Sequence, residues 1–166
     1  MRIEVVEGDV TQQPVDAVVT AANQALKGGG GVDAAVHRAA GPELVRASRA
    51  LAPCPTGSAA VTPAFDLAPV RWVVHAVGPR YRGRPQDAEL LASAYTSSLA
   101  RADEVGARSL AFPSISTGVY GYPDEEAARV SVAALRGATS DVERVVLVAR
   151  GHRMADLWRR ALDETP

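Results

Sequence analysis

Six short apolar runs, rich in β-branched residues, limit the folds open to this chain more than any other feature. Runs of about four to eight such residues, bounded by Gly, Pro, Asn or Asp, are typical of strands. Helical patterns separate most of the runs, and strands that alternate with helices indicate an α/β sandwich. The predicted strands cover residues 3–6, 15–20, 58–62, 70–77, 109–112 and 142–148.

The helices are predicted from apolar stripes and from the residues that flank them. Leu91, Tyr95 and Leu99 lie at helical spacing, and so do Ala127 and Val130, which follow a proline and three acids that favour a helix start. Further helices are predicted over 32–40, 43–51 and 152–163. No helix separates the first run from the second or the third from the fourth, so we expect a mixed sheet.

Length and composition exclude several classes of protein. A chain of 166 residues predicts one domain, spanning 1–166, around one core. It has no run of roughly 18 apolar residues that could cross a bilayer and no signal-peptide pattern at its start, so we expect a cytoplasmic protein that does not bind membranes. With 18 Lys and Arg against 19 Asp and Glu, the net charge of -1 will not drive binding to nucleic acid. We also expect a monomer.

Two glycine-containing segments follow predicted strands and precede predicted helices. They are Lys-Gly-Gly-Gly-Gly-Val-Asp at 27–33 and Ser-Ile-Ser-Thr-Gly-Val-Tyr-Gly at 114–121. At such junctions glycine lets the backbone approach a ligand, and the helix start favours an anion, so the pair predicts a diphosphate site. Neither segment has the spacing of a Rossmann or P-loop motif. The alternative is a flexible surface loop and a polar turn.

An acid and a histidine lie close together where the first of these segments enters its helix. Asp33 alone is explained by capping or by the helix dipole. Beside a diphosphate, however, a carboxylate would repel the phosphates unless it contacted a sugar hydroxyl or an attacking water. His37 lies four residues later, on the same helix face, where it can orient the acid, act as a base or simply pack as a half-buried side chain.

Two further polar residues follow strands at the edge where α/β folds place ligands. Asn23 comes after the second run, and its amide can hold a ribose hydroxyl or can form an ordinary turn. Asp9 comes after the first run, where it can accept a hydrogen bond from an adenine amino group or form an Asx turn.

Other polar residues point to no further chemistry. Cys54, the single cysteine, stands between two prolines and is expected to be a small buried hydrophobe rather than a nucleophile, and it excludes an internal disulfide. A metal site is not expected, because His75 and His152 lie in distant segments without evident partners. Ser116 with His37 and Asp33 lacks the elbow of a hydrolase triad. The basic segment 80–84 predicts a solvated connection, with contact to an acidic or nucleic-acid partner as the alternative.

Taken together, these motifs resemble the macrodomain family, in particular its MacroD-type branch. The pairing of Asn23 with Gly-Gly-Gly-Val-Asp at 29–33 and Ser-Thr-Gly-Val-Tyr-Gly at 116–121 is highly specific. The resemblance covers nearly the whole chain, through segments 8–11, 20–23, 28–33 with His37, 54–57, 75–79 and 112–122.

The resemblance implies a fold and an activity. The fold is a single macrodomain, a three-layer α/β/α sandwich with a mixed six-stranded sheet and an ADP-ribose cleft above it. The activity is hydrolysis of the ester that links ADP-ribose to acidic side chains of proteins, and deacetylation of O-acetyl-ADP-ribose. ADP-ribose, ADP-ribosylated proteins and O-acetyl-ADP-ribose are thus the implied partners, and no cofactor is implied.

By position, the resemblance also implies the site residues. Asn23 and Asp33 would position the distal ribose and the attacking water, with His37 in support, and these three are the candidate catalytic residues. Asp9 and Val10 would hold adenine. The implied ADP-ribose-binding residues are Asp9, Val10, Ala22, Asn23, Gly30, Gly31, Val32, Ser114, Ser116, Thr117, Gly118, Val119, Tyr120 and Arg150.

The chain departs from the family pattern at three positions. Thr20 stands where Asn is usual, Ala34 where Gly is common, and Arg150 where an aromatic follows the last strand. Arg150 can stack on adenine through its guanidinium plane.

Two other functions compete with hydrolysis. One is a non-catalytic reader of ADP-ribosylated protein, and the other is a phosphatase for phosphorylated ADP-ribose. The presence of both Asn23 and Asp33 favours the hydrolase, because a pure binder needs the anion-binding loops but not a carboxylate facing the ribose.

Overall fold

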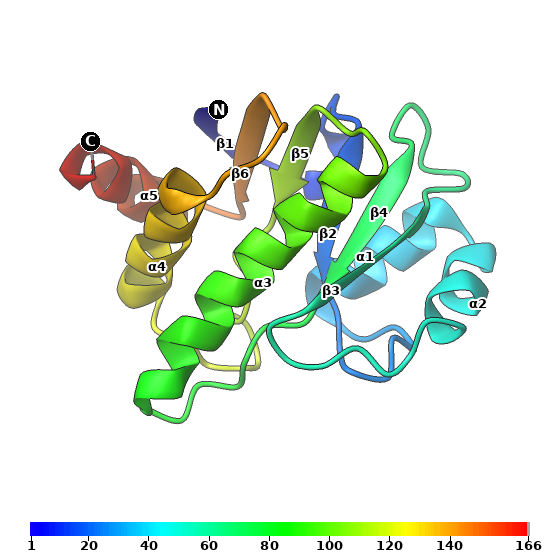
Figure 1. The fold of residues 1–166 in the computed structure, drawn as a ribbon, viewed down its shortest axis with the longest axis horizontal. Coiled ribbons are helices and arrows are strands. Elements are labelled where there is room, and N and C mark those ends of the chain that lie inside the picture. The colour runs from blue at the N-terminus through cyan, green and yellow to red at the C-terminus, as the bar shows by residue number, and fades with distance from the viewer. Residues whose placement is uncertain (166) are drawn as a thin grey trace.

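The computed structural model describes residues 1–165 and shows a six-stranded mixed sheet in the order β1-β6-β5-β2-β4-β3 (Figure 1). All neighbouring strands run parallel except β3 and β4, which pair antiparallel with Val61 opposite Val74. The strands are β1 (Arg2–Glu7), β2 (Ala17–Ala21), β3 (Ala59–Pro63), β4 (Trp72–Ala76), β5 (Ser109–Phe112) and β6 (Arg144–Ala149).

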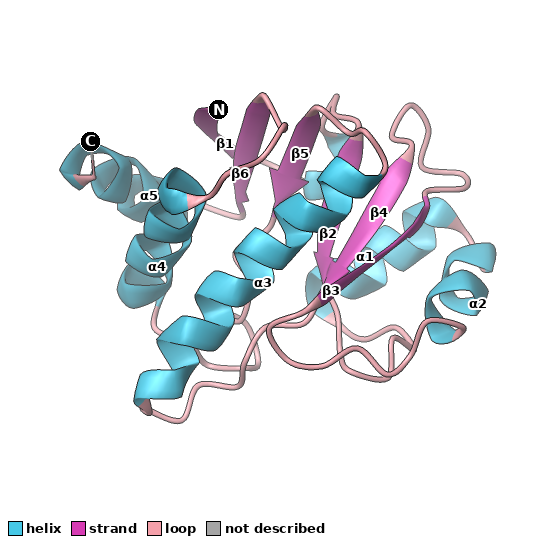
Figure 2. Ribbon diagram, viewed as in Figure 1, coloured by secondary structure: helices cyan, strands magenta, loops and turns pink. Residues whose placement is uncertain are grey.

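Helices cover both faces of the sheet, which confirms the predicted three-layer sandwich (Figure 2). Two of them lie on one face and three on the other. They are α1 (Gly31–Ala40), α2 (Glu43–Arg49), α3 (Pro85–Glu104), α4 (Asp124–Gly137) and α5 (His152–Glu164), and a 3-10 turn, η1, covers Val10–Gln12. No helix within residues 1–165 combines the length and apolarity needed to cross a membrane.

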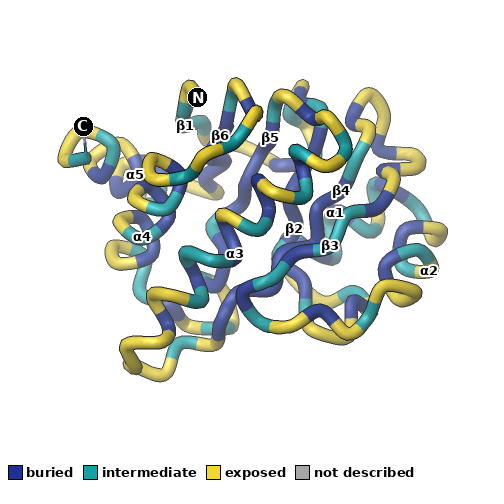
Figure 3. Tube along the Cα trace, viewed as in Figure 1, coloured by how far each residue is buried: buried dark blue, intermediate teal, exposed yellow. Residues whose placement is uncertain are grey.

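The sheet is buried on both faces because successive side chains alternate between two cores (Figure 3). In β6, Val145 and Leu147 pack with α3, α4 and α5, whereas Val146 and Val148 pack with α1 and α2. In the larger core, Trp158 is fully buried and its indole Nε1 donates to Ser131 Oγ at 3.0 Å, so its polar atom is satisfied.

The ends of all six strands lie within two residues of the predicted runs, and the largest differences have a physical reason. The runs 15–20 and 70–77 are longer than β2 and β4, because Val15 and Val70 are buried in the core below α1 and α2 without joining the ladder. An apolar run in the sequence indicates that its residues are buried, whereas the bounds of a strand depend on which residues pair with a neighbouring strand. The expected mixed sheet is confirmed by β3 and β4, which are consecutive in the chain and pair antiparallel. The first two strands are also consecutive, but β1 pairs with β6 in parallel and does not pair with β2.

This strand order creates the place for a site. β2 and β5 are parallel neighbours, and the chain leaves β2 toward α1 on one face but leaves β5 toward α4 on the other. In open α/β sheets ligands bind at such a switch point, beyond the carboxyl ends of the strands. The two glycine-containing segments follow β2 and β5 and therefore lie at this point.

Candidate functional site

Two cavities join into one cleft above the carboxyl ends of the strands. The first, of about 470 Å³, is named here the central cavity and is lined by Asn23, Asp33 and Tyr120, among others. The second, of about 450 Å³, is named the outer cavity and is lined by Asp9 and Arg150. Both cavities share the wall residues Gly31, Val32, Ser114 and Gly118. The structure therefore brings both predicted loops to one cleft.

The first glycine segment ends where α1 begins. Gly31 has φ +59°, a conformation that side chains other than glycine rarely adopt, and no side chain caps the helix at Gly30. A Cβ added at Gly30 would meet no atom within 4 Å, so the backbone is open toward the cleft. The first N–H groups of a helix without a side-chain cap are suited to an anion.

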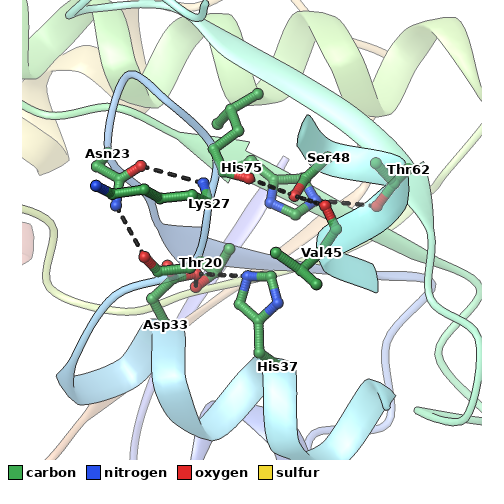
Figure 4. A network of polar contacts seen from close by, with 11 residues as sticks. Thr20, Asn23, Lys27, Asp33, His37, Val45, Ser48, Thr62 and His75 are labelled. Atoms are coloured by element: carbon green, nitrogen blue, oxygen red, sulfur yellow. Dashed lines mark hydrogen bonds and ion pairs between the residues drawn. The ribbon is translucent and has the colours of Figure 1, made fainter. Parts of the chain in front are cut away.

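Asp33 is buried against β2 and does not cap its helix (Figure 4). Thr20 Oγ1 donates to Asp33 Oδ1 at 2.8 Å, and His37 Nε2 lies 3.4 Å from the same oxygen. Burial raises the pKa of Asp33, although the hydrogen bond from Thr20, the proximity of His37 and the backbone N–H of Gly29 oppose the shift. Thr20, where the family usually has Asn, thus serves as a hydrogen-bond donor to this acid.

His75, for which the sequence shows no evident partner, lies close to His37. Its ring centroid lies 6.2 Å from that of His37, and its Nε2 is 2.9 Å from Thr62 Oγ1 on the antiparallel neighbour β3 (Figure 4). Burial, with a smaller effect of His37, lowers the pKa of His75 to about 3. Within residues 1–165 no group of three or more His, Cys, Asp or Glu side chains is placed to hold a metal ion.

Asn23 lines the central cavity and also closes the first glycine segment. Its Nδ2 donates to the Gly28 carbonyl at 3.0 Å, and its Oδ1 accepts from the Lys27 N–H at 3.3 Å (Figure 4). The turn role considered from the sequence is therefore present. An asparagine amide carries two donor hydrogens, so one remains for a ligand.

The base of the second glycine segment is closely packed and hydrogen-bonded. Ser116 has φ +68°, and its carbonyl accepts from the Tyr122 N–H at 2.9 Å. Its buried Oγ packs against Gly78, where an added Cβ would overlap it, and finds no hydrogen-bond partner within residues 1–165. The nucleophilic serine of a catalytic triad is hydrogen-bonded to its base, and Ser116 Oγ has no such bond among the described residues, so the structure does not support a triad at Ser116. At the tip, Val119 is 95% exposed.

The helix start contributes less to the second segment than the sequence suggested. α4 begins at Asp124, beyond the segment, and its first turn carries three acids. Asp124 itself lines the outer cavity, where it accepts from Arg153 Nε at 3.3 Å. Anion contacts here would depend on the backbone of the glycine segment rather than on the α4 dipole.

The outer cavity carries charged groups near the surface. Asp9 Oδ1 accepts from the N–H and the Oγ1 of Thr11, at 2.9 and 2.7 Å, which is the Asx turn considered above. These bonds lower the pKa of Asp9, and the charge of Arg150 adds to the effect. Both bonds go to Oδ1, and within residues 1–165 no hydrogen bond occupies Oδ2, so a ligand can reach it.

Sequence reasoning missed several lining residues. Arg153 and Met154, at the start of α5, line the outer cavity, and Gly78 and Arg80, after β4, line the central one. The rule that pointed to the ends of β1, β2 and β5 applies equally to β4 and β6 and could have found them. Segment 80–84 is largely exposed, as predicted, with Arg80 itself at the surface, but the sequence did not show that Arg80 stacks over the Tyr120 ring, with its Cζ 4.8 Å from the ring centroid.

Cys54 matches its prediction as a buried small residue. It packs with Ala22, Leu26 and Val77 in a small apolar cluster below the first glycine segment. Burial raises the pKa of its thiol, so the thiolate is disfavoured.

Comparison with known proteins places the cleft in context. The family model described as "Macro domain" matches residues 19–131, which include both glycine segments. A Macro domain-containing protein of Ralstonia nicotianae is 48% identical, over 98% of this chain and 95% of the relative. A protein of Salmonella gallinarum named O-acetyl-ADP-ribose deacetylase is 46% identical, over 98% of this chain and 95% of the relative.

Solved structures agree with the fold. The Oceanobacillus iheyensis macrodomain, in a mutant form with ADPR, has a TM-score of 0.92 at 38% identity, covering 98% of this chain and 92% of that one. The Trypanosoma brucei macrodomain in complex with ADP-ribose has a TM-score of 0.87 at 34% identity, covering 97% and 69%.

Proposed function

Because the chain belongs to the macrodomain family, we propose that it binds ADP-ribose in the joined cavities and hydrolyses esters of ADP-ribose, as in the MacroD-type branch. The substrates would be ADP-ribose linked to acidic side chains of proteins and O-acetyl-ADP-ribose. The observation that carries the proposal is Asp33, a buried carboxylate that lines the central cavity between two anion-binding loops.

The dimensions of the cleft suit an extended dinucleotide-like ligand. Adenine would occupy the outer cavity beside Asp9 and Arg150, and the distal ribose would occupy the central cavity beside Asn23 and Asp33. The diphosphate would cross the wall that the cavities share, where Gly31 and Gly118 leave the backbone uncovered.

In this arrangement Asp33 would orient or deprotonate the attacking water. Hydrolysis consumes one water and returns ADP-ribose with a free carboxylic acid, so no redox partner is required. A base that works near neutral pH benefits from a raised pKa, which burial gives to Asp33. Thr20 and His37 both contact Oδ1 of this carboxylate, and Asn23 would hold a ribose hydroxyl with its remaining amide hydrogen.

Product analysis on three substrates tests the proposal. The purified chain would be incubated with a glutamate-linked ADP-ribosyl peptide, with O-acetyl-ADP-ribose and with a phosphorylated ADP-ribose. We expect ADP-ribose from the first two. Tight binding without release of ADP-ribose would overturn hydrolysis in favour of a reader, and release of inorganic phosphate alone would indicate a phosphatase.

A further inference from the structure

A third cavity, of about 450 Å³, continues from the central cavity away from the outer one. It shares Gly78, Arg80 and Tyr120 with the central cavity but shares no lining residue with the outer cavity. Its remaining lining includes Arg82 and Arg84, so it is named here the arginine cavity. The three cavities are therefore connected in the order outer, central, arginine.

Hydrogen bonds hold the backbone of the segment that carries the arginines of this cavity, which is called here the arginine wall. Asp87, a buried residue in the first turn of α3, accepts from the N–H groups of Arg82 at 2.8 Å and Arg84 at 3.1 Å. The Tyr81 N–H donates to the Tyr120 carbonyl at 2.8 Å, which joins this segment to the second glycine segment. The guanidinium groups consequently project from a backbone that is fixed on both sides.

Positive charge at this wall exceeds the charge that opposes it. Of the three arginines that line the cavity, Arg84 lies 3.9 Å from the buried Asp87, and Arg80 stacks on Tyr120. Arg82 forms no ion pair with the residues that the structure describes, and no carboxylate among them lines the cavity. A chain with net charge -1 thus presents a local cationic surface beside its proposed reaction centre.

Resting on the proposed function, we propose that the arginine cavity binds acidic side chains that flank the ester-modified residue of a protein substrate. The nucleotide part of the ligand would fill the outer and central cavities. Only the acceptor side of the ester can then reach the arginine cavity, which also contains Gln24, the residue after Asn23. Arginine pairs with carboxylates through two parallel hydrogen bonds, so acidic flanks match the wall.

The same wall is poorly suited to a nucleic-acid acceptor. Recognition of single strands relies on bases stacked on free aromatic faces. Here Arg80 stacks on the Tyr120 ring, and the Tyr81 ring packs edge-on against Tyr122, with 5.0 Å between the ring centroids. The described lining of the cavity contains three arginines and a single aromatic ring that already stacks with one of them, which favours a peptide carboxylate.

Two ester-linked ADP-ribosyl peptides test this proposal. Both carry ADP-ribose on the same glutamate, one with Asp and Glu flanks and the other with Asn and Gln flanks, and O-acetyl-ADP-ribose serves as the substrate without flanks. We expect wild type to prefer the acidic peptide in kcat/KM by about fivefold at low salt, the size expected of two exposed ion pairs. Arg82→Gln with Arg84→Gln should abolish the preference and leave hydrolysis of O-acetyl-ADP-ribose within about twofold.

A matched control separates local charge from overall charge. Arg71→Gln with Arg160→Gln removes two exposed arginines elsewhere and should retain the preference. Because Arg84 contacts Asp87, Arg82→Gln alone provides a second variant that leaves that contact in place. It should retain the wild-type melting temperature and lose part of the preference.

Several results would overturn the proposal. Equal kcat/KM of wild type on both peptides would do so, as would a preference that survives both cavity substitutions. Stronger inhibition by a 5′-phosphorylated oligonucleotide than by an unmodified acidic peptide would assign the wall to nucleic acid. If wild type hydrolyses no substrate, the proposed function fails. Titration with the two peptides then still tests the arginine cavity, because equal affinity for both peptides would refute a cavity that binds acidic side chains.

Discussion

The central and outer cavities are neighbours, but they hold their polar groups in opposite ways. In the central cavity Asp33 and Asn23 are bonded to the protein itself, through Thr20 and the carbonyl of Gly28. In the outer cavity Asp9 and Arg150 are exposed, and Asp9 is held by one local turn. A buried, supported carboxylate is suited to orienting a reacting water, whereas exposed charges contribute mainly to affinity. The difference predicts that chemistry and binding can be separated by mutation.

The largest expected effect is at Asp33. Asp33→Asn keeps the size of the side chain and an oxygen that can accept from Thr20, but it removes the negative charge. We expect the single-turnover rate of ADP-ribose release from a glutamate-linked peptide to fall by about 100-fold or more, the usual effect of a general base. ADP-ribose affinity, measured by calorimetry, should change only a few-fold. A variant as fast as wild type would show that Asp33 is merely structural.

A substitution in the wall shared by the central and outer cavities should lower the affinity for ADP-ribose, in contrast to Asp33→Asn, which should mainly lower the rate. A Cβ at Gly118 meets nothing within 4 Å, so Gly118→Val should fold normally but place methyl groups where the diphosphate passes. Affinity for ADP-ribose should fall by about tenfold or more, in line with roughly 1–3 kcal/mol for an overpacked contact. Thermal unfolding checks the fold. Unchanged affinity in a folded variant would contradict the diphosphate path between the loops.

A smaller effect is expected in the outer cavity. Asp9→Asn retains an oxygen for the Thr11 turn but replaces Oδ2, the acceptor proposed for the adenine amino group. We expect about tenfold weaker binding, near the lower limit for a hydrogen bond to a charged group because the site is exposed. The hydrolysis rate at saturating substrate should stay near that of wild type. Loss of rate rather than affinity would erase the proposed division between the cavities.

The smallest effect concerns stability and follows from the raised pKa of Asp33. Between the ordinary pKa of an aspartate and this raised value, the unfolded chain has released the proton that the folded chain still holds. The free energy of unfolding contributed by Asp33 is therefore present at low pH and is lost as pH rises through that window. Asp33→Asn should remove this loss and be more stable than wild type at neutral pH.

Urea unfolding of both proteins at several pH values measures the effect. His75 contributes the opposite slope, because its lowered pKa means that stability is lost as pH falls from about 6.5 toward about 3. This contribution is common to wild type and Asp33→Asn, so the difference between them isolates Asp33. A difference that does not change with pH would refute the raised pKa.

Much of the fold could be predicted from the sequence because alternation and helical spacing are local properties. The strand 109–112 is predicted to the residue, and both glycine segments do meet in one cleft. The proximity of His37 and His75 could not be predicted in this way, because it depends on how a helix seats on the sheet. The same holds for Gly78, whose missing side chain makes room for Ser116 across the cleft. The residue roles, the cytoplasmic location and the monomeric state stay predictions.

The single buried thiol can report local opening of the structure below the cleft. The Cys54 N–H donates to the Gln24 carbonyl at 2.8 Å, so the thiol and the strand end that bears Asn23 are tied together. A thiol reagent can react only while this small cluster is open, and no second cysteine contributes a signal. The labelling rate therefore reports how often the floor below the first glycine segment opens. If a bound ligand slows the labelling, the ratio of the rates without and with ligand measures how strongly binding in the cleft suppresses the opening of this cluster.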